Sequence, residues 1–247
     1  ISFRNGLATL TETLTAKLDK QIYRETAVES IEKTDTGWQL IAKRFNRRLR
    51  DTYDAILLAL PPSQLAKIEF KKNGKNLSLR ELAEIPHPPV VSVSLGFSRS
   101  QVAHPLDGFG MLLPEKEQKQ ILGTIFASTL FPNRAPKDHV LLTTFVGGTR
   151  NPDLANASEK TIRRIVLENL QALLGIRGEP VFEKMTFWPH AIPQYNLGHG
   201  RFIQLIENFE AENPGIHIAG STRDGIALGQ CIASGRKRAD ELTKAKK

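Results

Sequence analysis

Residues 217–235 read HIAGSTRDGIALGQCIASG. A short apolar run leads into a polar loop that contains Gly220 and Gly225, and a helical pattern with small residues on one face follows. Glycine lets a backbone approach a bound group closely because it has no Cβ. A helix that begins after such a loop also offers unpaired N–H groups to an anion. We therefore expect a cofactor at this stretch, with a dinucleotide as the first ligand to consider.

Composition narrows the classes of protein to consider. The 247 residues, 40% of them hydrophobic, suit a globular protein of one large or two modest domains. The net charge is +8, and the basic residues are scattered apart from clusters at 43–50, 236–238 and 244–247. We predict that these clusters are solvated surface, and the alternative is contact with an acidic ligand or an anionic membrane surface. No nucleic-acid-binding motif accompanies them, so no nucleic-acid partner is predicted. The sequence contains no run of about 18 apolar residues, so no membrane span is predicted.

Hydrophobic periodicity predicts how helices and strands follow one another. Helices are expected at 7–18, 158–174 and 201–209, and strands at 26–31, 37–42, 55–60, 90–97, 123–127, 140–146 and 181–188. The run 55–60 is continuously apolar, which is typical of a strand covered on both faces. The order predicts an α+β unit inserted between two pieces of a strand-and-helix domain. No Gly-x-Gly-x-x-Gly follows a strand, so this sequence lacks the phosphate cradle of a Rossmann unit.

The usual catalytic patterns are missing from the sequence. Its six histidines have no spacing typical of a metal site, so no metal is predicted. No Gly-x-Ser-x-Gly nucleophile motif occurs. Catalytic residues therefore stay unassigned, and His199, beside a Pro-Gln-Tyr sequence, is the histidine to test. The single cysteine, Cys231, excludes an internal disulfide and is interpreted as a small buried hydrophobe in preference to a redox thiol.

Several segments, in order along the chain, carry a family resemblance. They are SFRNGLATL (2–10), YDAILLALP (53–61), GFGMLLP (108–114), LGTIFAS (122–128), LFPNRAP (130–136), FVGG (145–148), WPHAIPQY (188–195) with Gly198-His199, and residues 220–235. This set resembles the amine-oxidase-like FAD superfamily, and specifically its oxygen-dependent protoporphyrinogen oxidase branch. The resemblance implies an α/β plus α+β fold. In this fold, residues 1–60 and 185–247 form a partial FAD-binding domain of the amine-oxidase/glutathione-reductase-like type. Residues 61–184 form an inserted mixed-sheet substrate-binding domain.

The front of the sequence departs from that family. Its members begin with a Rossmann glycine-rich loop, an acidic ribose-binding residue and a membrane-associating helical region, and none of these is found here. The resemblance therefore implies the C-terminal portion of such an enzyme, with the missing N-terminal half as its partner. We expect that this chain alone does not retain FAD. Peripheral membrane association belongs to the full-length parent, and the expected location is the cytoplasm or the inner face of a membrane.

The resemblance also implies site residues. Cofactor contacts are expected at Val28, through its backbone at the adenine end of FAD, at Trp188, and at Gly220, Gly225, Ile226, Ala227 and Leu228 against the flavin ring. Substrate contacts are expected at Leu112, Leu113 and Phe131. Each has an ordinary structural alternative, namely core packing for the apolar side chains and a strand-to-helix turn for the glycine stretch. Arg134 could pair with a substrate carboxylate, although a loop-fixing or solvated role is favoured.

The implied reaction is oxidation of protoporphyrinogen IX to protoporphyrin IX, with O2 as the acceptor, in haem biosynthesis. Six electrons and six protons leave the substrate in successive two-electron steps, and the flavin carries the redox chemistry. Two alternatives stay open. One is oxidation of coproporphyrinogen III by the close relative in the same family, and the other is a catalytically inactive fragment with a binding or assembly role.

Overall fold

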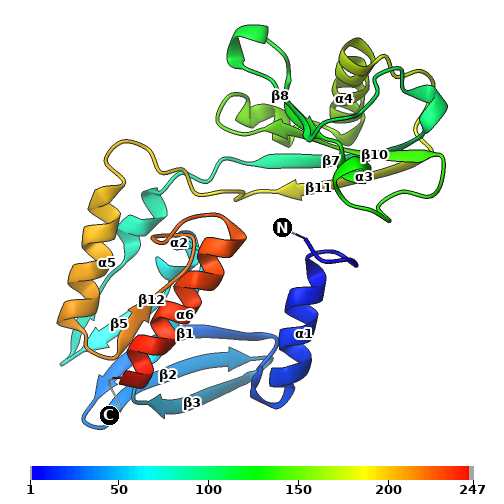
Figure 1. The fold of residues 1–247 in the computed structure, drawn as a ribbon. Helices are drawn as coiled ribbons and strands as arrows, with labels where there is room; N and C mark the ends of the chain where they lie inside the picture. The colour runs from blue at the N-terminus through cyan, green and yellow to red at the C-terminus, as the bar shows by residue number, and fades with distance from the viewer. Residues whose placement is uncertain (1, 245–247) are drawn as a thin grey trace. The chain divides into compact units, whose positions relative to one another are not determined.

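The computed structural model of the protein describes residues 2–244, so residues 245–247 of the C-terminal basic cluster lie outside it. The chain forms two compact units (Figure 1). Unit 1 contains the residues up to Asp19 together with His87–Ala191, and unit 2 contains Lys20–Pro86 and the residues from Ile192 onward. The sequence predicts divisions after residues 60 and 184 instead. The first division differs because residues 69–77 add two strands to the sheet of unit 2, and the second differs because residues 182–188 form a strand of the sheet of unit 1.

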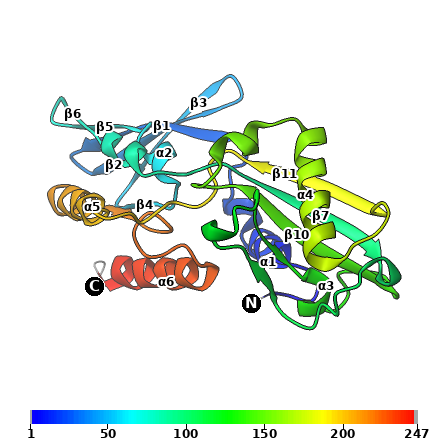
Figure 2. The same ribbon diagram turned by 90° about the horizontal axis from the view of Figure 1, so that it is seen from above.

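Unit 1 is built on a five-stranded sheet with the order β11-β7-β10-β9-β8, antiparallel throughout. The strands are β7 (Val90–Ser98), β8 (Gly110–Leu112), β9 (Ile121–Ile125), β10 (His139–Gly147) and β11 (Phe182–Trp188). Four of them match strands expected from the apolar runs, and the short β8 was not expected. Helix α4 (Glu159–Leu174) lies across one face of this sheet (Figure 2).

The core of unit 1 lies between α4 and the sheet. The apolar stripe of α4 supplies five buried residues, Ile162, Ile165, Val166, Leu170 and Leu174. They pack against inward-facing residues of β7 and β10, among them Val93, Leu95 and Leu142. Ser158 caps the helix because its Oγ accepts a hydrogen bond from the Thr161 N–H at 3.2 Å.

The N-terminal segment of unit 1 contains helix α1 (Ala8–Leu18), which the leucine spacing predicted. Arg134 ties the start of this segment to the Pro-Asn-Arg loop. Its Nη2 donates to Ser2 Oγ at 3.2 Å and to the Phe3 carbonyl at 3.3 Å. None of the α1 side chains is buried.

Unit 2 contains a five-stranded mixed sheet with the order β3-β2-β1-β5-β6. Its strands are β1 (Thr26–Thr34), β2 (Gly37–Arg44), β3 (Arg47–Tyr53), β5 (Glu69–Lys72) and β6 (Lys75–Leu77). The predicted hairpin is confirmed as β1 and β2, and β5 pairs parallel to β1. The basic cluster 43–50 covers the turn between β2 and β3, where Arg48 pairs with Glu29 on the surface.

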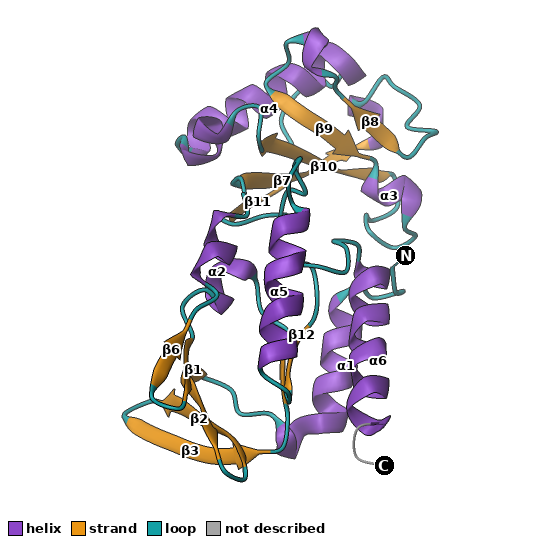
Figure 3. Ribbon diagram, turned by 90° about the vertical axis from the view of Figure 1, so that its left-hand side faces the viewer, coloured by secondary structure: helices purple, strands orange, loops and turns teal. Residues whose placement is uncertain are grey.

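A second element of unit 2 is a two-stranded parallel sheet formed by β4 (Ile56–Leu58) and β12 (Ile216–Ile218). Helix α5 (Gly200–Glu212) runs beside β12 (Figure 3), and helix α6 (Leu228–Lys244) follows it in the chain. Ile56 and Leu58 are buried, but Leu57 is 37% exposed. The described residues therefore do not cover both faces of β4 as expected, because Leu57, between two buried neighbours, lies on a face that stays partly open.

The remaining helices are short. They are α2 (Pro62–Leu65), α3 (Ala127–Leu130) and the 3₁₀ turns Asp19–Gln21, Arg80–Glu84, Arg99–Gln101, Glu115–Glu117 and Pro152–Asn156. Among the residues that the structure describes, every helix is too short or too polar to cross a lipid bilayer.

Candidate functional site

The strand-to-helix stretch forms a compact turn in unit 2. We call residues 220–227, between β12 and α6, the glycine loop. The N–H groups of Arg223 and Asp224 both donate to the Gly220 carbonyl, at 3.2 and 3.1 Å. Gly220 has φ 100°, and no atom lies within 4 Å of the place where a Cβ would be. The loop therefore begins with a backbone that a flat ligand could approach closely.

Ser234 of helix α6 connects the helix to the glycine loop. Ser234 is buried, and its Oγ accepts a hydrogen bond from the Gly220 N–H at 3.1 Å. The same hydroxyl donates to Asp224 Oδ2 at 2.5 Å. One serine thus joins the first and fifth residues of the loop, which explains why a small hydroxylated residue suits this face of the helix.

A buried cation fixes the middle of the loop. The Arg223 side chain is only 9% exposed, and its Nη1 donates to Glu210 Oε2 of α5 at 2.7 Å. Glu207 Oε1 and Asp224 Oδ1 lie farther away, at 3.6 and 3.7 Å. The other oxygen of Glu210 accepts from the Ile218 N–H at 2.6 Å. Glu210 therefore links α5, the end of β12 and the loop.

Both backbone polar groups of Gly225 have a hydrogen-bond partner. Its N–H donates to the Tyr195 hydroxyl at 3.2 Å, and its carbonyl lies 3.6 Å from Cys231 Sγ. Burial raises the pKa of the Tyr195 phenol above its ordinary value. Cys231 thus contributes a weak hydrogen bond from α6 to the glycine loop, in keeping with a structural role.

The outer side of the loop is apolar and open. Ile226 and Leu228 are 49% and 39% exposed, and the Ala227 N–H is capped by Gln230 Oε1 at 3.0 Å. Thr222 has no exposed surface, and its Oγ1 has no hydrogen-bond partner among the described residues. Buried hydroxyls without a partner are uncommon, so Thr222 Oγ1 is an unsatisfied polar atom inside the loop.

Val28 lies elsewhere in unit 2, on β1. The pairing of β1 with β2 shifts by one residue between Val28 and Ser30, which marks a β-bulge. The Val28 side chain packs against the core of unit 2. Both the core role and a contact through the backbone are compatible with this position, because the bulge disturbs the backbone pairing while the side chain points into the core.

The other candidates belong to unit 1. Trp188 ends β11, is 51% exposed, and donates from Nε1 to Ser92 Oγ at 3.1 Å. Leu112 is 88% exposed, whereas Leu113 is 9% exposed and belongs to the core. The side chain of Phe131 is partly exposed, and the Arg134 guanidinium carbon lies 5.8 Å from its ring centroid. The structure thus separates the two leucines and leaves Leu112 as the one available to a ligand.

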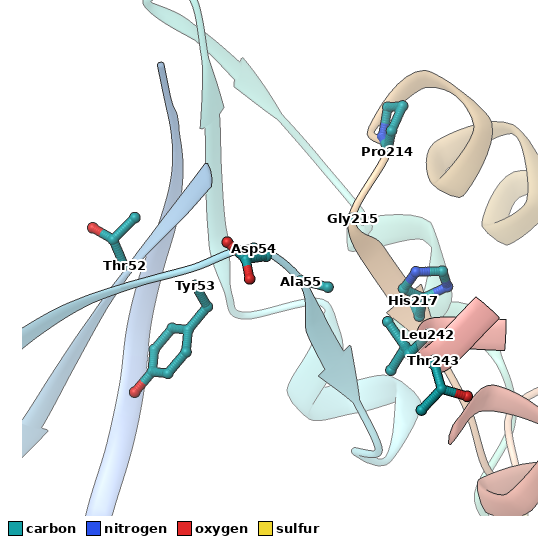
Figure 4. Close-up of a pocket in the computed structure, with 9 residues that line it drawn as sticks. All are labelled: Thr52, Tyr53, Asp54, Ala55, Pro214, Gly215, His217, Leu242 and Thr243. Atoms are coloured by element: carbon teal, nitrogen blue, oxygen red, sulfur yellow. The ribbon is translucent and has the colours of Figure 1, made fainter. Parts of the chain in front are cut away.

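A pocket of about 750 Å³ lies in unit 2 outside the predicted site (Figure 4). It is lined by Thr52, Tyr53, Asp54, Ala55, Pro214, Gly215, His217, Leu242 and Thr243. None of the predicted site residues lines it. Gly215 has φ 96°, and a Cβ at this position would lie 3.0 Å from Trp38 Nε1, which donates to the Pro214 carbonyl at 2.9 Å. The glycine therefore allows the tryptophan to pack closely.

The sequence did not single out several residues that shape the glycine loop. Ser234 and Tyr195 lie inside motifs that carry the family resemblance, and this was the only sign in the sequence that they are near the site. Arg223 and Glu210 gave none, since a charged residue in a polar stretch looks like solvated surface until the fold buries it.

Comparison with known proteins identifies the family of the chain. The family described as flavin containing amine oxidoreductase matches residues 1–243. Protoporphyrinogen oxidase 2, chloroplastic/mitochondrial, of Arabidopsis thaliana is 36% identical over 97% of the chain and 49% of its own length. Coproporphyrinogen III oxidase of Bacillus subtilis is 26% identical over 96% of the chain and 50% of its own length.

A solved structure supports the same relationship. The crystal structure described as a putative protoporphyrinogen oxidase from Exiguobacterium has a TM-score of 0.75 and 25% identity, over 98% of this chain and 51% of the other. The chain spans about half the length of the curated relatives it matches. Since the family match covers nearly every residue, the chain belongs to the flavin-containing amine oxidoreductase family.

Proposed function

We propose that this chain supplies the flavin-ring side of an FAD site and the substrate-binding part of an oxidase that converts protoporphyrinogen IX to protoporphyrin IX, with O2 as acceptor. The observation that carries the proposal is the 36% identity to the Arabidopsis protoporphyrinogen oxidase 2 over 97% of the chain. The ordered motifs that resemble this branch occur in both units, so the likeness is not confined to the cofactor region.

The glycine loop fits a flavin. Gly220 leaves space where any other residue would place a side chain. The first N–H groups of α6 have no partner one turn earlier. Ile226 and Leu228 add exposed apolar surface for a flat ring. A ring system edged with polar atoms matches this combination of open backbone, unpaired donor and apolar surface.

Bound FAD would accept hydride from the substrate at the flavin ring. The residues of this chain would orient the ring and exclude water. Residues 220–228 would lie against the ring, and the network of Ser234, Arg223 and Glu210 would keep the loop backbone in place. Val28 and Trp188 are proposed as further contacts to the cofactor. The two charged side chains of the loop, Arg223 and Asp224, are engaged with Glu210 and Ser234, so catalytic residues stay unassigned.

For the substrate, a tetrapyrrole needs apolar walls for its ring and cations or polar donors for its carboxylates. Leu112 and Phe131 are proposed to provide the apolar contact, supported by the exposure of Leu112. Leu113 is buried in the core and would act only by supporting its neighbour. Arg134 is already bonded to the N-terminal segment, which supports its loop-fixing role over pairing with a substrate carboxylate.

Coproporphyrinogen III is the second candidate substrate, because the Bacillus subtilis relative bears the name coproporphyrinogen III oxidase. The two substrates differ in the number of carboxylates that the cavity must accept. The net charge of +8 is compatible with either of them.

The experiment uses two polypeptides. One is this chain alone, and the other contains this chain joined to the remaining length found in its relatives. We expect the longer polypeptide to be yellow and to form fluorescent porphyrin from protoporphyrinogen IX faster than from coproporphyrinogen III, and this chain alone to be colourless. The opposite preference would favour the second candidate. A yellow longer polypeptide that oxidised neither substrate would favour an inactive or differently specific protein.

We further propose that this chain acts with the missing N-terminal portion as its partner, and that the assembled protein lies in the cytoplasm or peripherally at the inner face of a membrane. The first proposal is supported by the relatives, of which this chain covers about half the length. Fractionation of source cells with an antibody to this chain tests the location, since a protein released only by detergent would contradict it.

A further inference from the structure

The Pro-Gln-Tyr segment with Gly198-His199 has no part in the function proposed so far. It lies between β11 and α5, and its backbone is tied to unit 2 because the Gln194 N–H donates to the Pro86 carbonyl at 2.9 Å. Tyr195 and His199 stack with ring centroids 4.1 Å apart and planes inclined by 19°. Two aromatic rings four residues apart thus form one rigid element beside the glycine loop.

The Tyr195 hydroxyl joins two distant points of the glycine loop. It donates to the Ser221 carbonyl at 2.6 Å and accepts from the Gly225 N–H at 3.2 Å. A hydroxyl can do both at once because it carries one proton and two lone pairs. This single side chain therefore connects the start of the turn to its end.

His199 adds a third contact from the same segment. Its Nε2 lies 3.2 Å from the Thr222 carbonyl, and since a carbonyl only accepts, Nε2 is the protonated nitrogen. The ring is also flanked by Phe202 of α5, with centroids 5.7 Å apart. The histidine is therefore fixed by rings on two sides while it donates to the loop.

We propose that Tyr195 and His199 are positioning residues that set the backbone conformation of the glycine loop and thereby its fit to the flavin. The identity of the loop's ligand rests on the proposed function, but the restraint itself does not. The pair accounts for a Tyr and a His at this spacing in a chain whose redox chemistry needs neither side chain. Neither residue is assigned a contact with substrate.

The test begins with hydrogen–deuterium exchange of the chain without added ligand. Tyr195→Phe keeps the ring and its stacking but removes both hydrogen bonds, so amide exchange at Gly225 should rise about tenfold. Tyr53→Phe is the matched control, because Tyr53 is in the same unit and both tyrosines are 43% exposed. No hydrogen bond from the Tyr53 hydroxyl is seen among the described residues, so this variant should leave loop exchange unchanged.

A second pair of variants separates the histidine's hydrogen bond from its stacking. His199→Gln can still donate to the Thr222 carbonyl, and His199→Phe can only stack. We expect exchange in the loop to rise about fivefold in the Phe variant and to return toward the wild-type rate in the Gln variant. Equal effects of the two variants would overturn the role of the hydrogen bond.

The flavin-loaded longer polypeptide gives an independent readout. Tyr195→Phe should weaken FAD binding about tenfold and shift the flavin absorption band, while Tyr53→Phe should do neither. Unchanged exchange at Gly225 in Tyr195→Phe, or a rise spread evenly over unit 2, would overturn the inference. If the loop responds as expected but the wild-type protein oxidises no porphyrinogen, the proposed function fails and the restraint on the loop stands.

Discussion

Replacing Glu210 with alanine should destabilise unit 2 far more than replacing its neighbour Glu207. Glu210 pairs at 2.7 Å with Arg223, and the two side chains are 15% and 9% exposed. Removing one partner of a buried ion pair costs about 3–5 kcal/mol, because the other charge stays buried. The N–H of Ile218, which has no exposed surface, loses its acceptor as well.

The remaining carboxylates set the size of the effect. Glu207 and Asp224 lie 3.6 and 3.7 Å from the Arg223 guanidinium and can recover part of the loss. We therefore expect a loss of about 3 kcal/mol, at the lower end of that range. For a chain of this length that lowers Tm by about 9 °C.

The assay is thermal and denaturant unfolding of the chain, followed by circular dichroism. Glu207→Ala is the matched control, since Glu207 is 51% exposed and its longer contact should contribute about 0.5 kcal/mol. Glu210→Gln keeps an acceptor for the Ile218 N–H and should fall between the two. Equal losses in Glu210→Ala and Glu207→Ala would refute the reasoning that this pair is buried and anchors the loop.

Three further predictions concern other parts of the fold. Gly225 has φ 107°, and an added Cβ would lie 2.4 Å from the Gln230 side chain, so Gly225→Ala should cost about 2 kcal/mol and weaken FAD binding. Gly229→Ala, in open space in the first turn of α6, should change the stability by less than about 0.5 kcal/mol, and denaturant unfolding compares the two variants. Leu170→Ala, at a fully buried position of α4, should cost about 3 kcal/mol in the same assay, and a loss below about 1 kcal/mol would contradict the packing of unit 1. Burial raises the pKa of Tyr195, so its neutral phenol stabilises the fold fully below about pH 10, and this contribution is lost as the pH rises through the folded-state pKa. The denaturant midpoint of the wild type should fall over that range, and the midpoint of Tyr195→Phe should fall less.

Local patterns of residue type predicted one hairpin and the long helix of unit 1. The hairpin of β1 and β2 and helix α4 follow from period-two and helical spacing, with Ser158 as the expected type of cap. Strand β3 gave no such signal, because most of its side chains are exposed and charged or polar. Its strand character comes from pairing with β2, which a local pattern does not report.

The division into units depends on pairings between distant residues. Residues 61–86 belong with unit 2 because β5 pairs parallel to β1, and the N-terminal segment belongs with unit 1, where Arg134 bonds to Ser2 and Phe3. Neither pairing has a signature in a single sequence. The candidate site shows the same limit. The glycine stretch was recognisable from its composition, whereas its supports, Tyr195, Ser234 and Glu210, are identified only by where the fold brings them.

We propose that residues 220–228 form the flavin-ring side of an FAD site in a porphyrinogen oxidase. The most direct measurement follows porphyrin fluorescence and flavin absorbance together, in the polypeptide that joins this chain to the remaining length of its relatives. We expect bound FAD and oxygen-dependent formation of protoporphyrin IX, with FAD binding weakened and porphyrin formation slowed in Gly225→Ala but not in Gly229→Ala. Oxidation of a small amine with no porphyrin formed, or FAD binding that is indifferent to Gly225→Ala, would contradict it.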